Sequence, residues 1–194
     1  TIAQTWYQQT SGTDTALTDV YFLNKDTGFV CGAGWNSVIG IILKTTNGGT
    51  NWNIMDSNIA DGLNVIRFID ANTGFASGAH NGTLLKTTDG GITWNNMGPN
   101  MPNRYNGGMW FTNADTGFLA VGCLNFSFGN SKILKTFNGG VSWDTVYSGT
   151  SWINYFYFVD ADNGYATATG GIVLKTTDAG NNWSVISMGG NYWM

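Results

Sequence analysis

The sequence has no glutamate, a single histidine, two cysteines and two prolines among its 194 residues. Glutamate and lysine favour helices, so the absence of the first and the six copies of the second argue against a helical protein. Charged residues make up only 10% of the chain, and the net charge is −4. Nucleic-acid binding needs clustered lysine and arginine, which this composition does not supply. No apolar run approaches the roughly 20 residues that a membrane-spanning helix requires.

The scarce residue types also narrow the possible chemistry. A single histidine, His80, cannot build a multi-histidine metal site, and it is expected in an exposed tight loop. Two cysteines, Cys31 and Cys123, are too few for the disulfide framework of a small secreted domain. We expect them to be small buried side chains with no bond between them. The prediction is a protein with no metal and no cofactor.

What the sequence has in excess is glycine and aromatic residues: 28 Gly together with 9 Trp, 8 Tyr and 11 Phe. Such a composition is typical of many short strands joined by tight turns. Two short motifs recur along the chain. Thr-Gly-Phe stands at 27–29, 73–75 and 116–118, with Asn-Gly-Tyr at 163–165. A block that begins with Lys-Thr and ends with Trp stands at 44–52, 86–94, 135–143 and 175–183.

These motifs define four repeats of about 45 residues, at 14–56, 57–97, 98–147 and 148–188. The first repeat contains four strand-like runs, at 17–23, 28–32, 41–45 and 51–55, and the others match it. An Asn or Asp that caps its own backbone, followed four residues later by a glycine at positive φ, is expected to turn the first strand into the second. A period near 45 residues with four strands predicts an all-β propeller formed by the whole chain, 1–194, as one domain.

The blocks at the end of each third strand resemble Asp-boxes, the Ser/Thr-x-Asp-x-Gly-x-x-Trp turn of bacterial-neuraminidase-type repeats. The whole unit is similar to photosystem II assembly-factor-like and sortilin-like propellers, many of them exported bacterial proteins. The resemblance implies that the box residues stabilise turns and touch no ligand. They are Asn47, Gly49, Trp52, Asp89, Gly91, Trp94, Asn138, Gly140, Trp143, Asp178, Gly180 and Trp183. Four aligned lysines, Lys44, Lys86, Lys135 and Lys175, are expected to pair with turn carboxylates.

The ends of the chain do not complete a blade in a simple way. Residues 1–13 match a spare outer strand, and residues 189–194 match the start of a further blade. Three arrangements remain open at this stage: the four blades close alone, they form a segment of a ring of five to eight blades, or open edges pair between chains. The first residues also look like what remains after removal of a signal peptide. We therefore expect an exported bacterial protein, secreted or at the cell surface.

Enzymatic activity has little support in the residues. A sialidase needs an arginine cluster and a glutamate, which are absent. A glycoside hydrolase needs two carboxylates that flank the scissile bond. Most aspartates belong to repeated turns, and Asp19 is the best exception because the equivalent strand positions in the other repeats are not acidic. We find no second aspartate on a predicted strand that could act as its catalytic partner.

Ligand binding is expected where the repeats depart from one another. Exposed aromatic side chains near asparagines suit stacking on sugar rings, or they form the hot spot for a protein partner. The candidate ligand-binding residues are Trp35, Arg104, Tyr105, Phe126, Phe128, Trp152 and Tyr155. The alternative is that they only fill the wide end of a small propeller.

We interpret the sequence as a non-enzymatic, exported propeller that acts as a binding or assembly module. Its contacts are expected to be with a protein partner or with itself, through the terminal strands. A lectin-like propeller that binds polysaccharide is the first alternative, and a glycoside hydrolase with paired aspartates is the second.

Overall fold

The computed structural model describes residues 8–33, 39–78, 82–97, 104–123 and 131–187. Within these ranges the regular secondary structure is entirely β-strand, as the composition predicts. A helix able to cross a membrane is not found among the described residues.

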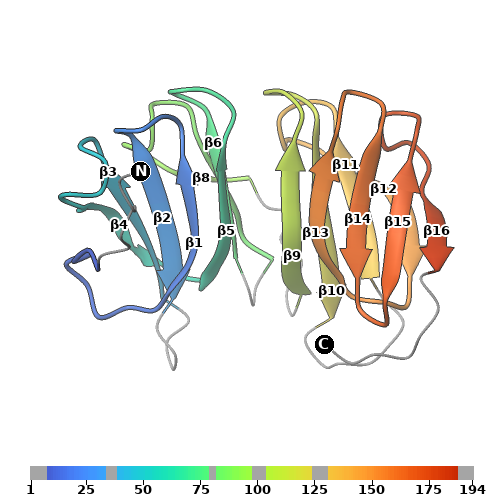
Figure 1. Ribbon diagram of the computed structural model, residues 1–194, viewed down its shortest axis with the longest axis horizontal. Helices are drawn as coiled ribbons and strands as arrows, with labels where there is room; N and C mark the ends of the chain where they lie inside the picture. The colour runs from blue at the N-terminus through green and yellow to red at the C-terminus, as the bar shows by residue number, and fades with distance from the viewer. Residues whose placement is uncertain (1–7, 34–38, 79–81, 98–103, 124–130, 188–194) are drawn as a thin grey trace, which may run out of the picture.

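In the described residues, sixteen strands form four antiparallel sheets of four strands each, which we call blades 1 to 4 (Figure 1). Each blade is a simple meander in which consecutive strands pair. Blade 1 contains β1 (Leu17–Phe22), β2 (Gly28–Ala33), β3 (Gly40–Thr45) and β4 (Asn53–Ile59), and blade 2 contains β5 (Leu63–Phe68), β6 (Gly74–Gly78), β7 (Leu84–Thr87) and β8 (Asn95–Asn96). Blade 3 contains β9 (Arg104–Phe111), β10 (Gly117–Cys123), β11 (Ser131–Thr136) and β12 (Asp144–Gly149), and blade 4 contains β13 (Ile153–Phe158), β14 (Gly164–Ala168), β15 (Ile172–Thr176) and β16 (Ser184–Ser187). The expected all-β fold with four-stranded blades is confirmed.

The first hairpin of each blade is closed by an Asx turn. In blade 1 the Asn24 side-chain oxygen accepts hydrogen bonds from the backbone N–H groups of Asp26 and Thr27, at 2.9 and 2.8 Å. The glycine that follows is needed for a reason that the sequence did not reveal. Gly28 is not at positive φ; a Cβ there would stand only 2.7 Å from the ring of Phe22 on the paired strand. The expectation of positive φ is wrong, and close approach of the ring explains the glycine.

The turn between the third and fourth strands is held by its own side chains. In blade 1 the Thr45 hydroxyl accepts from the N–H of Gly49 at 2.9 Å, and Asn47 Oδ1 accepts from the N–H of Asn51 at 2.9 Å. Gly48 and Gly49 both have positive φ, which glycine adopts without steric cost. The other three turns repeat these bonds around Asp89, Asn138 and Asp178.

The blades pack face to face through stacked aromatic rings. Phe29 on β2 of blade 1 stacks on Phe68 on β5 of blade 2, with ring centroids 3.8 Å apart. The equivalent pairs are Phe75 with Phe111 at 3.7 Å and Phe118 with Phe158 at 4.6 Å. All three rings on the second strands are almost completely buried, so these contacts form the core between blades.

A lysine beside each ring reaches the next blade. Lys44 Nζ donates to the carbonyl oxygen of Gly90 at 2.8 Å, across the interface from blade 1 to blade 2. The same bond recurs as Lys86 to Gly139 at 3.0 Å and Lys135 to Ala179 at 2.6 Å. For these three lysines the expected pairing with turn carboxylates is therefore wrong. Each donates to a backbone carbonyl oxygen of the box turn, the turn between the third and fourth strands, of the next blade.

The inner strands β1, β5, β9 and β13 contact one another in chain order and lie in the middle of the molecule (Figure 1). Among the described residues, β13 and β1 make no contact of comparable extent. Within the described structure, blades 1 and 4 are therefore the two ends of an open series. The predicted partial strands at 1–13 and 189–194 lie mainly outside the described residues.

Candidate functional site

Three inner strands bring together Asp19, Arg67 and Tyr155, from β1, β5 and β13. Each of these strands has a shift in register near its start, just before Asp19, Val65 and Tyr155. Such a bulge redirects the side chains that follow it. Asp19 and Tyr155 therefore hold equivalent positions in blades 1 and 4, and Arg67 lies two residues beyond the equivalent position in blade 2.

Arg67 is the centre of this inner-strand cluster. One guanidinium nitrogen, Nη1, donates to Asp19 Oδ2 and to the backbone carbonyl of Ile66, the latter at 2.6 Å. The other, Nη2, donates to the Tyr155 hydroxyl at 3.0 Å. Asp19 Oδ2 also accepts from the N–H of Ile66 at 3.0 Å. Three blades are thus tied together by one side chain.

The cluster combines a shielded ion pair with an exposed aromatic ring. The side chains of Arg67 and Asp19 are 15% and 21% exposed, so water screens their attraction only in part. Tyr155 is 52% exposed, and the Arg67 guanidinium carbon lies 5.8 Å from its ring centre. A cation at this distance favours one position of the ring. The inner strands therefore expose a tyrosine ring whose position is restrained by Arg67.

The inner-strand cluster contains one carboxylate, Asp19, whereas a glycoside hydrolase uses two. In the described part of the chain, the recorded partners of Asp19 are the donors Arg67 and the Ile66 N–H. A nucleophile or general base next to a second acid would need carboxyl groups at about 5 to 9.5 Å. Within the same ranges, no three His, Cys or Asp side chains gather in a way that could hold a metal ion.

The remaining candidates from the sequence are only partly described. Trp152 is half-buried, and its ring lies over Gly122 of β10, where a Cβ would come within 3.0 Å of it. Arg104 and Tyr105 lie at the start of β9, but their side chains fall outside the described part. Trp35, Phe126 and Phe128 also lie outside the described residues. Only Tyr155 of this set is seen in the inner-strand cluster.

Arg67 is the functional candidate that the sequence analysis missed. It was judged only as one of too few arginines for a sialidase. The positions equivalent to it are occupied by Tyr21, Trp110 and Tyr157, as the pairing with the second strand of each blade shows. An arginine at a position that is aromatic in the other three repeats was therefore the feature of the sequence that could have identified Arg67 as a candidate.

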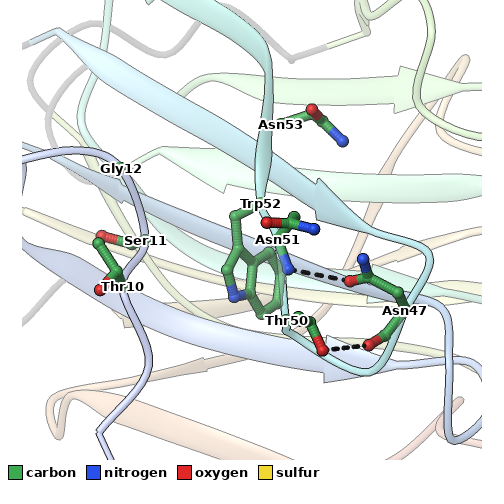
Figure 2. A pocket seen from close by; sticks show the side chains of 8 residues that line it. All are labelled: Thr10, Ser11, Gly12, Asn47, Thr50, Asn51, Trp52 and Asn53. Carbon is green, nitrogen blue, oxygen red and sulfur yellow. Dashed lines mark hydrogen bonds between the residues drawn. The ribbon is translucent and has the colours of Figure 1, made fainter.

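A groove lies beside the turn between the third and fourth strands of blade 1 (Figure 2). A polar groove of about 570 Å³ separates residues 10–12 from the box turn, with the Trp52 ring between them. The Asn51 N–H and the Thr50 hydroxyl both bond to Asn47, and these bonds fix the turn. The full lining is Thr10, Ser11, Gly12, Asn47, Thr50, Asn51, Trp52 and Asn53.

Cys31 lies behind the inner strands and takes no part in either site. Its side chain is fully buried and forms no disulfide. Burial raises the pKa of the Cys31 thiol to about 12, so the thiolate is almost absent at neutral pH. This thiol is a packing group.

The family is established by the sequence of the first two blades. A family model described as the photosynthesis system II assembly factor YCF48 matches residues 1–100, just over half of the chain. The chain belongs to the YCF48 family. No curated protein matches the sequence.

Solved structures agree with this family at the level of the fold. A structure titled YCF48 bound to D1 peptide is 17% identical, with a TM-score of 0.64 over 92% of this chain and 55% of that one. YCF48 from Cyanidioschyzon merolae is 16% identical, with a TM-score of 0.64 over 92% of this chain and 61% of that one. An ancestral GH74 enzyme is 20% identical, with a TM-score of 0.70 over 93% of this chain and 25% of that one. The chain thus spans 55–61% of the length of the two YCF48 structures and 25% of the GH74 enzyme.

Proposed function

We propose that this YCF48-family chain is a non-enzymatic binding module that holds a protein or peptide partner at the inner-strand cluster. The observation that carries the proposal is the arginine-tyrosine contact, in which Arg67 fixes an exposed Tyr155 while Asp19 fixes Arg67. Tyrosine and arginine are the residues most often found at the energetic centre of protein interfaces. A tyrosine already held in one position loses little further freedom when a partner binds.

The family and its solved relatives support this choice over catalysis. One YCF48 structure contains a bound D1 peptide, so a propeller of this family can take a peptide partner. The GH74 relatives are enzymes of the same fold, but the fold alone does not specify the chemistry. The partners of Asp19 favour a positioning role for this carboxylate. Export of the protein remains a prediction.

The experiment that tests the proposal is peptide selection on the intact chain. Random peptides displayed on phage are enriched on the wild-type protein, and the enriched peptides are synthesised and titrated by calorimetry. We expect Tyr155→Ala to raise the dissociation constant at least about tenfold, the size of a typical hot-spot loss. Ile92→Ala is the matched control, because Ile92 is an exposed apolar residue on the box turn of blade 2, outside the cluster. Failure to enrich any peptide, or equal affinity in both variants, contradicts the proposal.

The same preparation separates binding from hydrolysis. We expect the wild-type chain to release no reducing ends from xyloglucan. Release that disappears in Asp19→Asn favours a hydrolase instead.

The groove at the end of blade 1 supports carbohydrate binding as a second candidate. An indole ring beside amide and hydroxyl groups is the usual surroundings of a bound sugar ring. Affinity electrophoresis in gels that contain polysaccharide tests this candidate. Retardation of the wild-type chain that is lost in Asn53→Ala supports it, and unchanged mobility in every gel contradicts it.

A further inference from the structure

The chain contains three similar interfaces between neighbouring blades. Each joins a projecting half, on the earlier blade, to a receiving half, on the next blade. Blade 4 has an unpaired projecting half and blade 1 an unpaired receiving half in the described structure. In each internal interface a Phe on the second strand and a Lys on the third strand face the next blade. The Phe stacks on a ring of the next blade, and the Lys bonds to its box carbonyl, as Phe29 and Lys44 do with Phe68 and Gly90. The lysine ammonium also lies over the phenyl ring of its own blade, 5.3 Å from the centroid in blade 1.

In the described structure, blade 4 carries the projecting half, which is the side with the second-strand ring and the third-strand lysine, and no further blade packs on it. The strand pairing places Tyr165 and Lys175 at the positions of Phe29 and Lys44. Lys175 Nζ lies 5.8 Å from the centroid of Tyr165, in the same arrangement as the internal lysines. Within the described residues, this ring contact is the only interaction recorded for the Lys175 ammonium. The same blade exposes the apolar side chains of Tyr157, which pairs with Tyr165, of Val159 just after β13, and of Ile186 on β16.

In the described structure, blade 1 carries the receiving half, and no further blade packs on it. Val20 and Phe22 are 55% and 42% exposed, whereas the equivalent Ile66 and Phe68 of blade 2 are 0% and 4% exposed. Phe22 already meets Trp52 edge to face, with centroids 6.1 Å apart. The internal receiving halves show the same geometry, for example Phe68 with Trp94 at 5.9 Å. The surface of blade 1 is therefore formed as if a preceding blade were present.

A short segment of the same chain partly fills the space where that preceding blade belongs. Gln9 Nε2 donates to the carbonyl oxygen of Gly48, which is the equivalent of the carbonyls that the internal lysines reach. This bond is exposed and 3.4 Å long, against 2.6–3.0 Å for the lysine bonds. A charged donor forms the stronger bond, so a lysine can displace Gln9. The groove of Figure 2 lies between this segment and Trp52.

We propose that blade 4 of one copy docks on blade 1 of a second copy, so that the two end faces form a fourth interface of the internal kind. Tyr165 stacks on Phe22 of the second copy, and Lys175 donates to its Gly48 carbonyl after Gln9 moves away. The occupant is a second copy because the chain itself supplies both complementary halves at equivalent positions. Its own blade 4 does not fill the site, since β13 and β1 make no extensive contact in the described structure. The contact is head-to-tail, so two copies close into one ring or further copies extend the series.

The test is the solution mass of the full chain, measured by light scattering over a wide range of concentration. We expect the wild type to reach at least twice the mass of the 20.9 kDa chain. Val159→Asp on blade 4 and Val20→Asp on blade 1 each bury a charge in the interface, and each is expected to raise the dissociation constant roughly 100-fold. Val141→Asp is the matched control, because Val141 is 70% exposed on the box turn of blade 3, away from both end faces. It is expected to associate like the wild type.

A mixture of the two variants tests the head-to-tail geometry itself. The Val159→Asp chain keeps an intact blade 1 face, and the Val20→Asp chain keeps an intact blade 4 face. Mixing them is therefore expected to give a two-copy complex that neither forms alone. Circular dichroism identifies any variant that fails to fold, and Lys175→Met then replaces Val159→Asp. A wild type that stays monomeric, variants that associate like the control, or a mixture that does not associate overturns the proposal.

Discussion

Lys135 Nζ donates to the carbonyl oxygen of Ala179 in the next blade at 2.6 Å, the shortest of the three lysine bonds between blades. The same ammonium also donates to Asn181 Oδ1 at 2.8 Å, and the lysine is only 2% exposed. Burial lowers the pKa of Lys135, and the negative charge of Asp178 partly opposes this. The cation is kept in the interface because the box turn of blade 4 supplies it with acceptors.

Replacement of this lysine should therefore destabilise the fold. We expect Lys135→Met to lower the free energy of unfolding by about 2–3 kcal/mol, since two acceptors lose a charged donor in a buried interface. Equilibrium urea denaturation followed by tryptophan fluorescence measures the loss.

The control for this prediction is Lys175→Met, which changes the equivalent lysine of blade 4. In dilute, monomeric protein we expect a change within about 0.5 kcal/mol, as for other surface substitutions. Equal losses in the two variants would show that the bond between blades is not the source of the effect.

Two of the four box turns contain an aspartate, and these turns make stability depend on pH. Hydrogen bonds from Thr93 lower the pKa of Asp89 to about 2, and bonds from Asn182 lower the pKa of Asp178 to about 2. Because both pKa values fall on folding, the stabilisation is complete above the unfolded pKa near 3.8 and is lost as the pH falls toward 2. The two asparagine turns cannot titrate in this range.

Asp89→Asn is therefore expected to reduce the loss of stability between pH 4 and pH 2, while the fold at neutral pH is kept. Asn47 and Asn138 show that an amide forms the same turn. Urea denaturation of both proteins at a series of pH values gives the two slopes. The prediction fails if the variant loses as much stability as the wild type on acidification.

The local turns that repeat along the chain could be predicted from the sequence, whereas the contacts between strands and between blades could not. The Asx turns and box turns depend on residues two to four positions apart, so their spacing is visible in one repeat. The requirement for Gly28 comes from the Phe22 ring across the hairpin, and no spacing rule reveals a contact between rings and backbone. The four strands of each blade followed from the pattern of apolar residues and turns alone.

The candidate site was harder to predict because it is made by residues far apart in the sequence. Arg67 and Tyr155 are 88 residues apart, and each was visible only as a departure from its repeat. The lysines were misassigned for the same reason, since their carbonyl acceptors stand one blade later. Every residue has a backbone carbonyl, so the residue types in the sequence do not indicate which carbonyl accepts a bond from a lysine.

Ala179 is a local exception that can be corrected. It has φ of 57°, in the left-handed region, where the other three box turns have Gly48, Gly90 and Gly139. A residue with a Cβ in this conformation destabilises the fold by roughly 1–2 kcal/mol. Glycine removes this strain, but it also increases the conformational entropy of the unfolded chain, so the net gain in stability is smaller. We expect Ala179→Gly to raise the free energy of unfolding by about 0.5–1 kcal/mol.

Gly139→Ala makes the opposite change at the equivalent position of blade 3. A Cβ there would stand 2.5 Å from Lys86 Nζ, in addition to the cost of positive φ. We expect a loss of at least about 1 kcal/mol in the same urea experiment. Changes of the same sign in the two variants would contradict the assignment of strain to Ala179.

The inner-strand cluster predicts a specific pattern of coupling between its members. Asp19→Ala removes the acceptor of both Arg67 and the Ile66 N–H and should lower stability by about 1–3 kcal/mol, because the pair is largely shielded. In an Arg67→Met background the same change should cost less, which gives a coupling of about 1–2 kcal/mol. Arg67 and Tyr155 meet at an exposed edge, so their coupling, measured with Tyr155→Phe, should be below about 1 kcal/mol. Double-mutant cycles by urea denaturation measure both values. We proposed that Asp19 fixes Arg67 and that Arg67 in turn fixes Tyr155. A stronger coupling of Arg67 to Tyr155 than to Asp19 would contradict this, because Tyr155 would then be the main residue that holds Arg67 in place.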